Sequence, residues 1–271
     1  MNSKIFKIFL FTLFILFSSC IYKAEAIPEV SAKSYIVIDS DSGRIIGSRN
    51  PNEKLPIAST TKILTAILAI ENIENIETRI EVPAKCVNKA AELGALDSNF
   101  VNPHGLHDKN HYSTAYDLAL ISRYAMKNDI FKTISSSEKY VAESMNTVFY
   151  NKNKVVYQYE YGNGIKIGYT KAAGRCLVAS AEKDGTEIIV VVLNDGNWFQ
   201  DSYKIFDWVF ENYKTWQVVE EGQFAGRASD GTPVFIQDSF SYLMTEEEKD
   251  KIKVQTKITA PLLLNKDNKV V

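Results

Sequence analysis

A serine and a lysine three residues apart are the first groups in this sequence that could do chemistry. Ser59-Thr60-Thr61-Lys62 opens an apolar stretch that predicts a buried helix. Residues i and i+3 share a helix face, so the Ser59 hydroxyl and the Lys62 amine can approach each other. A serine attacks after a base takes its proton, and lysine is such a base when burial, here by the apolar helix, lowers its pKa. The pair indicates covalent catalysis, and a capping serine followed by a solvated lysine is the alternative.

A second lysine lies on a predicted strand, in the segment 164–170, which reads Gly-Ile-Lys-Ile-Gly-Tyr-Thr. The edge of such a strand can bind an extended peptide, with Lys166 as the cation for a terminal carboxylate. The charge of Lys166 would also help to keep Lys62 neutral, because like charges repel. The second segment therefore adds a place for a peptide beside the candidate nucleophile.

Helices and short strands must position these groups. Strand-like segments after Trp216 predict a small β unit, and the strands before it are antiparallel neighbours. We therefore expect an α+β fold, in which an antiparallel sheet has flanking helices and a small C-terminal β domain follows. The predicted elements are a hairpin at 35–46, helices over 59–71, 113–127 and 199–213, and strands at 154–161, 165–170, 176–181 and 187–193.

The composition is that of a globular protein without a basic surface. Its 271 residues are 45% hydrophobic and 24% charged, which excludes a disordered or collagen-like chain. The 31 Lys and Arg against 33 Asp and Glu give a net charge of −2, so nucleic acid is not an expected partner. The three cysteines lack metal-type spacing, and His104, His107 and His111 lie in a predicted loop. We expect no metal site and no cofactor.

The first 26 residues predict an export signal. Two lysines precede an apolar run over 8–17, and Ala24-Glu25-Ala26 has the small-x-small pattern of a cleavage site. A membrane anchor is disfavoured because the run is shorter than the roughly 20 apolar residues of a span. Lipidation at Cys20 is disfavoured because the residues before it fit that motif poorly. No later stretch predicts a transmembrane span, so we expect an exported, extracytoplasmic protein.

Four segments resemble the serine D-alanyl-D-alanine carboxypeptidases, the low-molecular-mass penicillin-binding proteins. The segments are 56–66 around Ser59, 100–106 (Phe-Val-Asn-Pro-His-Gly-Leu), 111–117 (His-Tyr-Ser-Thr-Ala-Tyr-Asp) and 168–181. The resemblance runs from about residue 30 to the C-terminus and implies the penicillin-recognising α+β fold. We therefore expect a signal peptide (1–26), a carboxypeptidase-like domain (27–215) and a C-terminal β domain (216–271).

The resemblance also implies roles for single residues. Ser59 would attack the penultimate D-Ala of a peptidoglycan stem peptide, with Lys62 as general base. The backbone N–H groups of Ser59 and Tyr169 would form the oxyanion hole. Lys166 would help to hold the terminal carboxylate on the strand segment that contains Gly168. Water would hydrolyse the acyl-enzyme, β-lactams such as penicillin would trap Ser59 by the same attack, and the protein would act in cell-wall synthesis and remodelling.

Two motifs of that family are altered in this chain. The second motif, Ser-x-Asn, is missing between the serine helix and residue 100, where the chain reads as shortened near residues 86–88. Ser144-Met145-Asn146 matches the motif as a string but lies in a different segment. The third motif, Lys-Thr-Gly, reads Lys166-Ile167-Gly168, which removes a hydroxyl donor to the substrate carboxylate.

The shortening predicts a structural and a functional consequence. With less helical cover we expect Ile63, Ile67 and Ile70 to be partly bare, and the protein to be less stable or to self-associate. Because loss of one catalytic group can cost about 10³–10⁶ in rate, the alternative is a catalytically impaired homologue that only binds cell-wall peptide or penicillin. A β-lactamase is least favoured, since no Glu stands in a matching context for deacylation.

Overall fold

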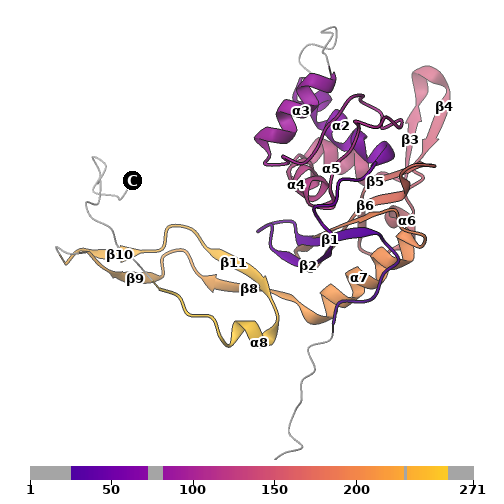
Figure 1. Ribbon diagram of the computed structural model, residues 1–271. Coiled ribbons are helices and arrows are strands. Elements are labelled where there is room, and N and C mark those ends of the chain that lie inside the picture. Colours follow the sequence, from indigo (N-terminus) through magenta and orange to yellow (C-terminus); the bar gives the residue numbers. More distant parts are fainter. Residues whose placement is uncertain (1–25, 73–81, 229–230, 256–271) are drawn as a thin grey trace, which may run out of the picture.

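A five-stranded antiparallel sheet forms the centre of the protein (Figure 1). The computed structural model describes residues 26–72, 82–228 and 231–255. The strands lie in the order β2-β1-β7-β6-β5, so strands distant in sequence complete one sheet. The predicted N-terminal hairpin and the last three predicted strands are confirmed. Their bounds are β1 (Ser34–Asp39), β2 (Ile45–Arg49), β5 (Gly162–Thr170), β6 (Gly174–Lys183) and β7 (Thr186–Leu193).

Helices cover both faces of the sheet (Figure 1). Strand β7 shows why both faces are apolar, because alternate side chains point to opposite sides of a strand. Ile189 and Val191 pack in the core on one face, and Ile188 and Val190 pack in the core on the other. The first face carries the 3₁₀ turn η1 (Ala58–Thr61), α2 (Lys62–Glu71), α3 (Val82–Glu92), α4 (Ala115–Met126) and α5 (Asp129–Ser136), and the second carries α7 (Trp198–Asn212).

Two predicted helices are confirmed as α4 and α7. Helix α4 begins where the sequence predicts it, because the Thr114 side chain accepts a hydrogen bond from the Asp117 N–H at 3.0 Å and so caps the helix. Helix α7 places Phe206 and Val209 in the core on the second face. The predicted serine helix is also present, but its first turn is a 3₁₀ turn.

Helix α2 is covered better than the sequence predicts. Ile63 and Ile67 are each 1% exposed, whereas Ile70 is only partly buried. Helix α3 supplies part of the cover, because Cys86 and Ala90 pack in the same core cluster. The prediction that positions 63 and 67 are partly bare is wrong, because the residues that follow α2 in the described chain fold back onto it.

Two further segments differ from the predictions. Residues 154–161 contain no strand but the short helix α6 (Val155–Gln158), because the Asn153 side chain accepts a hydrogen bond from the Val155 N–H at 3.2 Å. Between α5 and α6, where no strand is predicted, β3 (Lys139–Ala142) and β4 (Thr147–Tyr150) pair as a hairpin that projects from the body in Figure 1. A short 3₁₀ turn, η3 (Glu143–Met145), joins the two strands.

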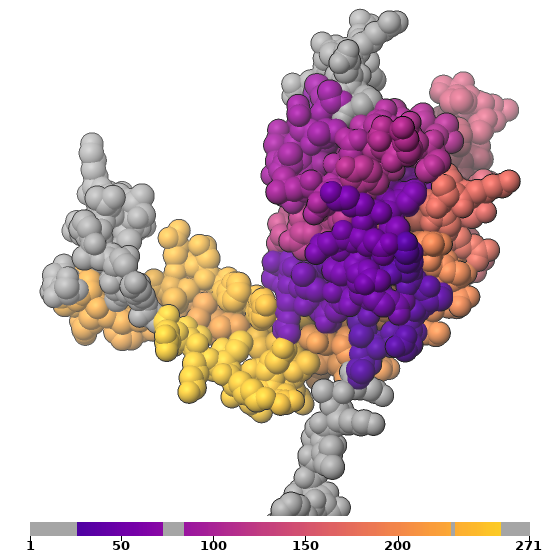
Figure 2. Space-filling view, viewed as in Figure 1, coloured from indigo at the N-terminus to yellow at the C-terminus, as the bar shows by residue number. Residues whose placement is uncertain are grey.

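The C-terminal segment forms two small β pairs that extend to one side of the body (Figure 2). Arg44 joins this extension to the sheet domain, because its guanidinium donates to the Leu243 carbonyl and to Glu248, at 2.5 Å each. No helix in the described residues is both long and apolar enough to cross a bilayer. The elements are β8 (Lys214–Val219), β9 (Phe224–Arg227), β10 (Pro233–Phe235), β11 (Phe240–Met244) and α8 (Glu246–Lys249).

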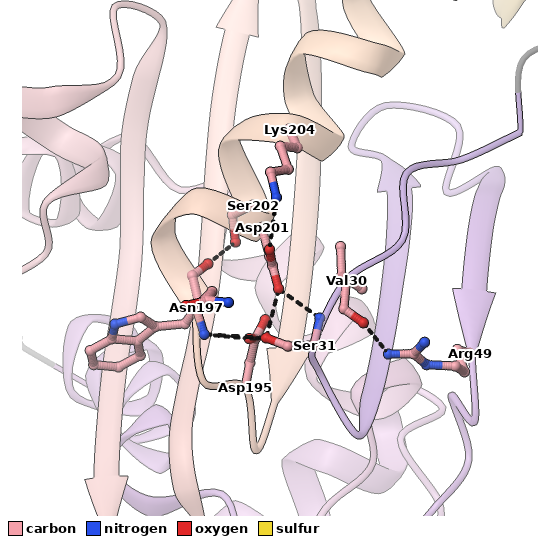
Figure 3. A network of polar contacts seen from close by, with 9 residues as sticks. Val30, Ser31, Arg49, Asp195, Asn197, Asp201, Ser202 and Lys204 are labelled. Carbon is pink, nitrogen blue, oxygen red and sulfur yellow. Dashed lines mark hydrogen bonds and ion pairs between the residues drawn. The ribbon is translucent and has the colours of Figure 1, made fainter.

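A buried polar cluster ties the N-terminal segment to α7 (Figure 3). The Ser31 N–H donates to Asp201 at 2.7 Å, and the Ser31 hydroxyl contacts the carboxylates of both Asp195 and Asp201. Asp195 also accepts a hydrogen bond from the Asn197 N–H at 2.8 Å. The two carboxyl groups belong to residues that are 1% and 2% exposed. Two buried acids in one cluster make the stability of this junction sensitive to their ionisation.

Candidate active site

Ser59 lies in a tight turn at the N-terminus of helix α2. Ala58, the first residue of turn η1, has a φ of +49°, a left-handed conformation that residues with a Cβ rarely adopt. The Lys62 Nζ lies 3.0 Å from the Ser59 Oγ and donates to it in the structure. The structure thus brings the predicted nucleophile and the predicted base to hydrogen-bond distance.

The loop after Phe100 holds the lysine and the serine turn from one side. The His104 carbonyl accepts a hydrogen bond from the Lys62 Nζ at 2.7 Å, and the Ser59 Oγ lies 3.4 Å from the same oxygen. Gly105 packs directly on the turn with a φ of +81°. A Cβ at position 105 would lie 2.9 Å from the Ser59 amide nitrogen, so only glycine permits this approach.

A chain of buried hydrogen bonds supports the serine turn. The Val101 N–H donates to His111 Nδ1 at 3.1 Å, His111 Nε2 lies 2.8 Å from Thr61 Oγ1, and Thr61 Oγ1 donates to the Ala58 carbonyl at 2.8 Å. An imidazole that accepts at Nδ1 has its proton on Nε2, so the chain requires neutral His111. Burial lowers the pKa of His111, which favours this form. The sequence predicts a loop here but gives no sign of its link to Thr61.

Strand β5 forms the opposite wall of the site. It is an edge strand, so part of its backbone N–H and C=O groups face away from β6 and can pair with an extended ligand. Gly168 lies against the serine turn, where a Cβ would come 2.8 Å from the Ser59 amide nitrogen. Tyr169 is 64% exposed. The predicted substrate-binding residues Lys166, Gly168 and Tyr169 therefore follow one another along the strand that flanks Ser59.

The two lysine amines have different surroundings. Burial lowers the pKa of Lys166, and the charge of Lys62 lowers it further. Partial burial also lowers the pKa of Lys62. Residue Lys62 as a whole is exposed, so its amine is buried only in part. Helix α2 turns its apolar side chains into the core, and Lys62 lies on the side that stays open.

A hollow of about 280 Å³ opens beside the two lysines. It lies between α2, α5 and β5, and both Lys62 and Lys166 line it. Asn151 and Asn153, which follow strand β4, add polar groups to its wall. The apolar part of the lining comes from Ile63, Ala66 and Ile70 of α2, Phe131 and Ile134 of α5, and Ile165 and Ile167 of β5.

One candidate motif from the sequence lies apart from this site. Ser144-Met145-Asn146 forms the exposed tip of the β3–β4 hairpin and does not line the hollow. The structure therefore gives this string no contact with the cavity beside Lys62. Within residues 26–72, 82–228 and 231–255, no three His, Cys, Asp or Glu side chains gather in a way that could hold a metal ion.

The site lies within the part of the chain that matches a known family. The sequence profile of the D-alanyl-D-alanine carboxypeptidases, peptidase family S11, matches residues 21–85 and 84–197. These segments make up more than half of the chain and contain Ser59, Lys62 and Lys166. The chain belongs to this family. Its predicted membership of the D-alanyl-D-alanine carboxypeptidases is thus confirmed.

Relatives in this carboxypeptidase family cover most of the chain. D-alanyl-D-alanine carboxypeptidase DacF of Bacillus subtilis is 26% identical over 322 aligned positions, which cover 89% of this chain and 83% of DacF. Penicillin-binding protein 5 of Haemophilus influenzae has a TM-score of 0.72 at 20% identity and covers 85% of this chain, with 87% of its own chain matched. Penicillin-binding protein D2 of Listeria monocytogenes, solved in the ampicillin-bound form, has a TM-score of 0.63 at 22% identity over 69% of this chain and 100% of its own. These structural likenesses confirm the predicted fold.

The matched segments and the alignment length can be compared with the predicted shortening of the chain near residues 86–88. The two segments matched by the carboxypeptidase profile meet at residues 84–85, next to the predicted position at 86–88. The alignment with DacF has 322 positions, which is 51 more than the 271 residues of this chain, so at least that many positions of DacF have no counterpart here. These lengths support a shortened chain, and the loss of the Ser-x-Asn motif stays a prediction.

Proposed function

We propose that this chain is a serine-type D-alanyl-D-alanine carboxypeptidase that removes the terminal D-Ala from peptidoglycan stem peptides. The observation that carries the proposal is the distance of 3.0 Å between Lys62 Nζ and Ser59 Oγ in a member of this family. A neutral Lys62 amine accepts the Ser59 proton as the oxygen attacks the carbonyl of the penultimate D-Ala. The proton then passes to the amine of the leaving D-Ala, and water hydrolyses the Ser59 ester.

The other residues of the site supply binding and stabilise charge. The backbone N–H groups of Ser59 and Tyr169 are our candidates for the oxyanion hole, because the N-terminus of helix α2 adds partial positive charge where the oxyanion forms. Lys166 is the cation for the terminal carboxylate, and a charge-assisted hydrogen bond of this kind is stronger than a neutral one. Gly168 leaves room for the Ser59 amide.

The same attack accounts for β-lactam binding and fits a cell-wall location. The Listeria relative was solved with ampicillin bound. We infer that a penicillin acylates Ser59 in this chain and stays attached as an ester. The export signal predicted at 1–26 would carry the protein to the cell-wall space, where stem peptides occur. There the 27–215 unit would hold the site, and the 216–271 unit would form the C-terminal β domain.

Labelling with a fluorescent penicillin tests the nucleophile. We expect the label on the wild-type protein and none on Ser59→Ala. Ser144→Ala is the matched control, because Ser144 is exposed at the tip of the β3–β4 hairpin and should keep the label. Release of D-Ala from a pentapeptide that ends in D-Ala-D-Ala then measures turnover in the same three proteins. Absence of any Ser59-dependent label would overturn the proposal.

The open side of Lys62 favours one second candidate, a homologue that binds cell-wall peptide or penicillin without turnover. Among the described residues, the Lys62 amine hydrogen-bonds only with the Ser59 Oγ and the His104 carbonyl. Because Lys62 is exposed as a residue, its amine keeps more contact with water than a fully buried amine, and this contact favours the charged form. Ser59-dependent penicillin labelling without D-Ala release would assign this second function.

A further inference from the structure

The hollow beside the lysines lies to one side of the reacting serine. On strand β5 its lining residues are 165–167, whereas the next residue, Gly168, lies against the Ser59 amide. On helix α2 the lining begins at Lys62 and runs to Ile70, and Ser59 is not part of it. The hollow therefore extends from the serine toward Lys166 and away from Tyr169.

This direction is the one taken by the leaving residue of a substrate. The proposed function places the scissile carbonyl at Ser59 and the terminal carboxylate at Lys166. The residue between these two groups is the C-terminal residue of the peptide. A peptide laid along β5 in this direction therefore has its last side chain next to the hollow.

The lining of the hollow suits an apolar side chain with a carboxylate beside it. Its walls are formed mainly by aliphatic and aromatic side chains of α2, α5 and β5. At its polar side, the Lys166 amine donates to a single acceptor among the described residues, the Ile167 carbonyl at 3.0 Å, although an ammonium group has three donors. Asn153 is 2% exposed, and its Nδ2 has no hydrogen-bond partner in the described part of the chain.

We infer that the hollow is the pocket for the leaving residue and that it selects C-terminal D-residues with an apolar side chain larger than methyl, such as D-leucine. This inference rests on the proposed function. The volume of about 280 Å³ is close to the roughly 300 Å³ at which small-molecule pockets begin. The methyl group of D-alanine fills only part of such a volume. A single methylene in an apolar pocket is worth about 10-fold or more in discrimination.

Two peptides that differ only in the last residue test the inference. Acetyl-L-Lys-D-Ala-D-Ala and acetyl-L-Lys-D-Ala-D-Leu are compared by kcat/KM with the wild-type full chain. The same peptides are compared by calorimetric binding to Ser59→Ala, which cannot form the acyl-enzyme. We expect the D-Leu peptide to be favoured by at least about 10-fold in both measurements.

Two pairs of variants locate the selectivity. Ala66 lines the hollow, so Ala66→Leu should abolish the D-Leu preference. Ala69 is exposed on the same helix and does not line the hollow, so Ala69→Leu should keep the preference. Ile134 lines the hollow and is 64% exposed, whereas Ile130 of the same helix is 51% exposed and does not line it. Ile134→Asn should reduce the preference severalfold and Ile130→Asn should keep it. The α5 pair is exposed, so it is informative even where Ala66→Leu fails to fold.

The outcomes separate this inference from the proposed function. Preferential binding of the D-Leu peptide without release of either residue supports the pocket and contradicts turnover. Release of D-Ala with no preference for D-Leu in either measurement supports turnover and overturns the pocket. A D-Leu preference that is unchanged in Ala66→Leu and Ile134→Asn, when both fold, also overturns it.

Discussion

Gly105 lies so close to Ala58 that a Cβ on the glycine would come 1.8 Å from the alanine carbonyl oxygen. Gly94 has the same φ of +81°, but among the described residues a Cβ there would meet only Leu120 Cδ1, at 3.8 Å. Gly105→Ala and Gly94→Ala therefore share a backbone cost of about 1–2 kcal/mol, and only Gly105→Ala adds a clash with the turn that holds Ser59.

We predict that Gly105→Ala lowers the rate of penicillin acylation by about 100-fold or more, because a displacement of about 1 Å can have such an effect. Gly94→Ala should acylate at the wild-type rate. The measurement is the rate of fluorescent penicillin labelling, with urea unfolding of both variants to show that each is folded. Equal acylation rates in the two variants would contradict the role given to the 100–106 loop.

The lowered pKa of Lys62 predicts how the reaction depends on pH. The base must be neutral, so kcat/KM for D-Ala release and the acylation rate should rise as pH increases toward the pKa of Lys62, which lies below its ordinary value because of burial. Lys62→Arg keeps the charge but stays protonated at every working pH. It should reduce acylation by about 10³-fold or more and remove the rising limb. A rising limb that persists in Lys62→Arg would assign the base elsewhere.

His111 predicts a loss of stability in mild acid. Burial, with the charges of His104 and His107, lowers its pKa in the folded protein below 6.5, and Asp108 opposes this only in part. The unfolded chain thus binds more protons below about pH 6.5, and the free energy of unfolding should fall as pH decreases from there. Protonated His111 would also present a donor to the Val101 N–H.

Urea unfolding at pH 7.5 and pH 5.5 measures this effect. His111→Gln should be less stable at pH 7.5 by about 1–3 kcal/mol, because it disturbs a buried hydrogen-bond chain. It should also lose less stability than the wild type between the two pH values. Lys109→Gln is the control, because Lys109 is exposed in the same loop, does not contribute to the lowered pKa of His111 and should keep the wild-type pH dependence. The same pH dependence in His111→Gln and the wild type would refute the prediction.

The two buried acids at the N-terminal junction predict substitutions of opposite sign. Burial raises the pKa of Asp195, so its ionisation costs stability as pH rises above about 3.8. For Asp201 burial acts the same way, but the hydrogen bonds from Ser31, together with Asp195 and the charge of Lys204, outweigh it and lower the pKa. The stability that Asp201 contributes is therefore present above about pH 3.8.

At pH 7 we expect Asp195→Asn to raise the free energy of unfolding by about 1 kcal/mol, because the amide oxygen still accepts hydrogen bonds while the buried charge is removed. Asp201→Asn should lower it by about 1–3 kcal/mol. Both differences should shrink near pH 3.5. Urea unfolding checks them, and a destabilised Asp195→Asn protein would show that its charge is needed for the Ser31 contact.

Local patterns made much of this fold predictable. Periodicity and capping predict strands β5, β6 and β7 and helices α4 and α7. Helix geometry predicts that Ser59 and Lys62 meet. All of these features depend on residues that are close in sequence. The link from His111 to Thr61 joins residues 50 positions apart, and no local pattern marks it. The cover that α3 gives to α2 likewise depends on tertiary packing.

The β3–β4 hairpin shows a different limit. Its strands are only four residues each, and most of their side chains are exposed, including Tyr140 and Phe149. Without a buried face, these strands have no alternation of apolar and polar residues that a sequence could reveal. The sequence does not predict the hollow either, because its walls come from α2, α5 and β5, which are three separate regions of the chain.

The position of β1 in the sheet determines when the protein can become reactive. Strand β1 pairs with β7 from Ser34 opposite Leu193 to Asp39 opposite Ile188. The first strand of the sheet therefore cannot complete its pairing until the last strand has been synthesised. Lys166 and Gly168 also follow Ser59 by more than a hundred residues in the chain. A nascent or clipped polypeptide that stops short of β7 has Ser59 and Lys62 but lacks the strand that joins β1 to β6 and β5. Such a fragment would react with neither peptide nor penicillin.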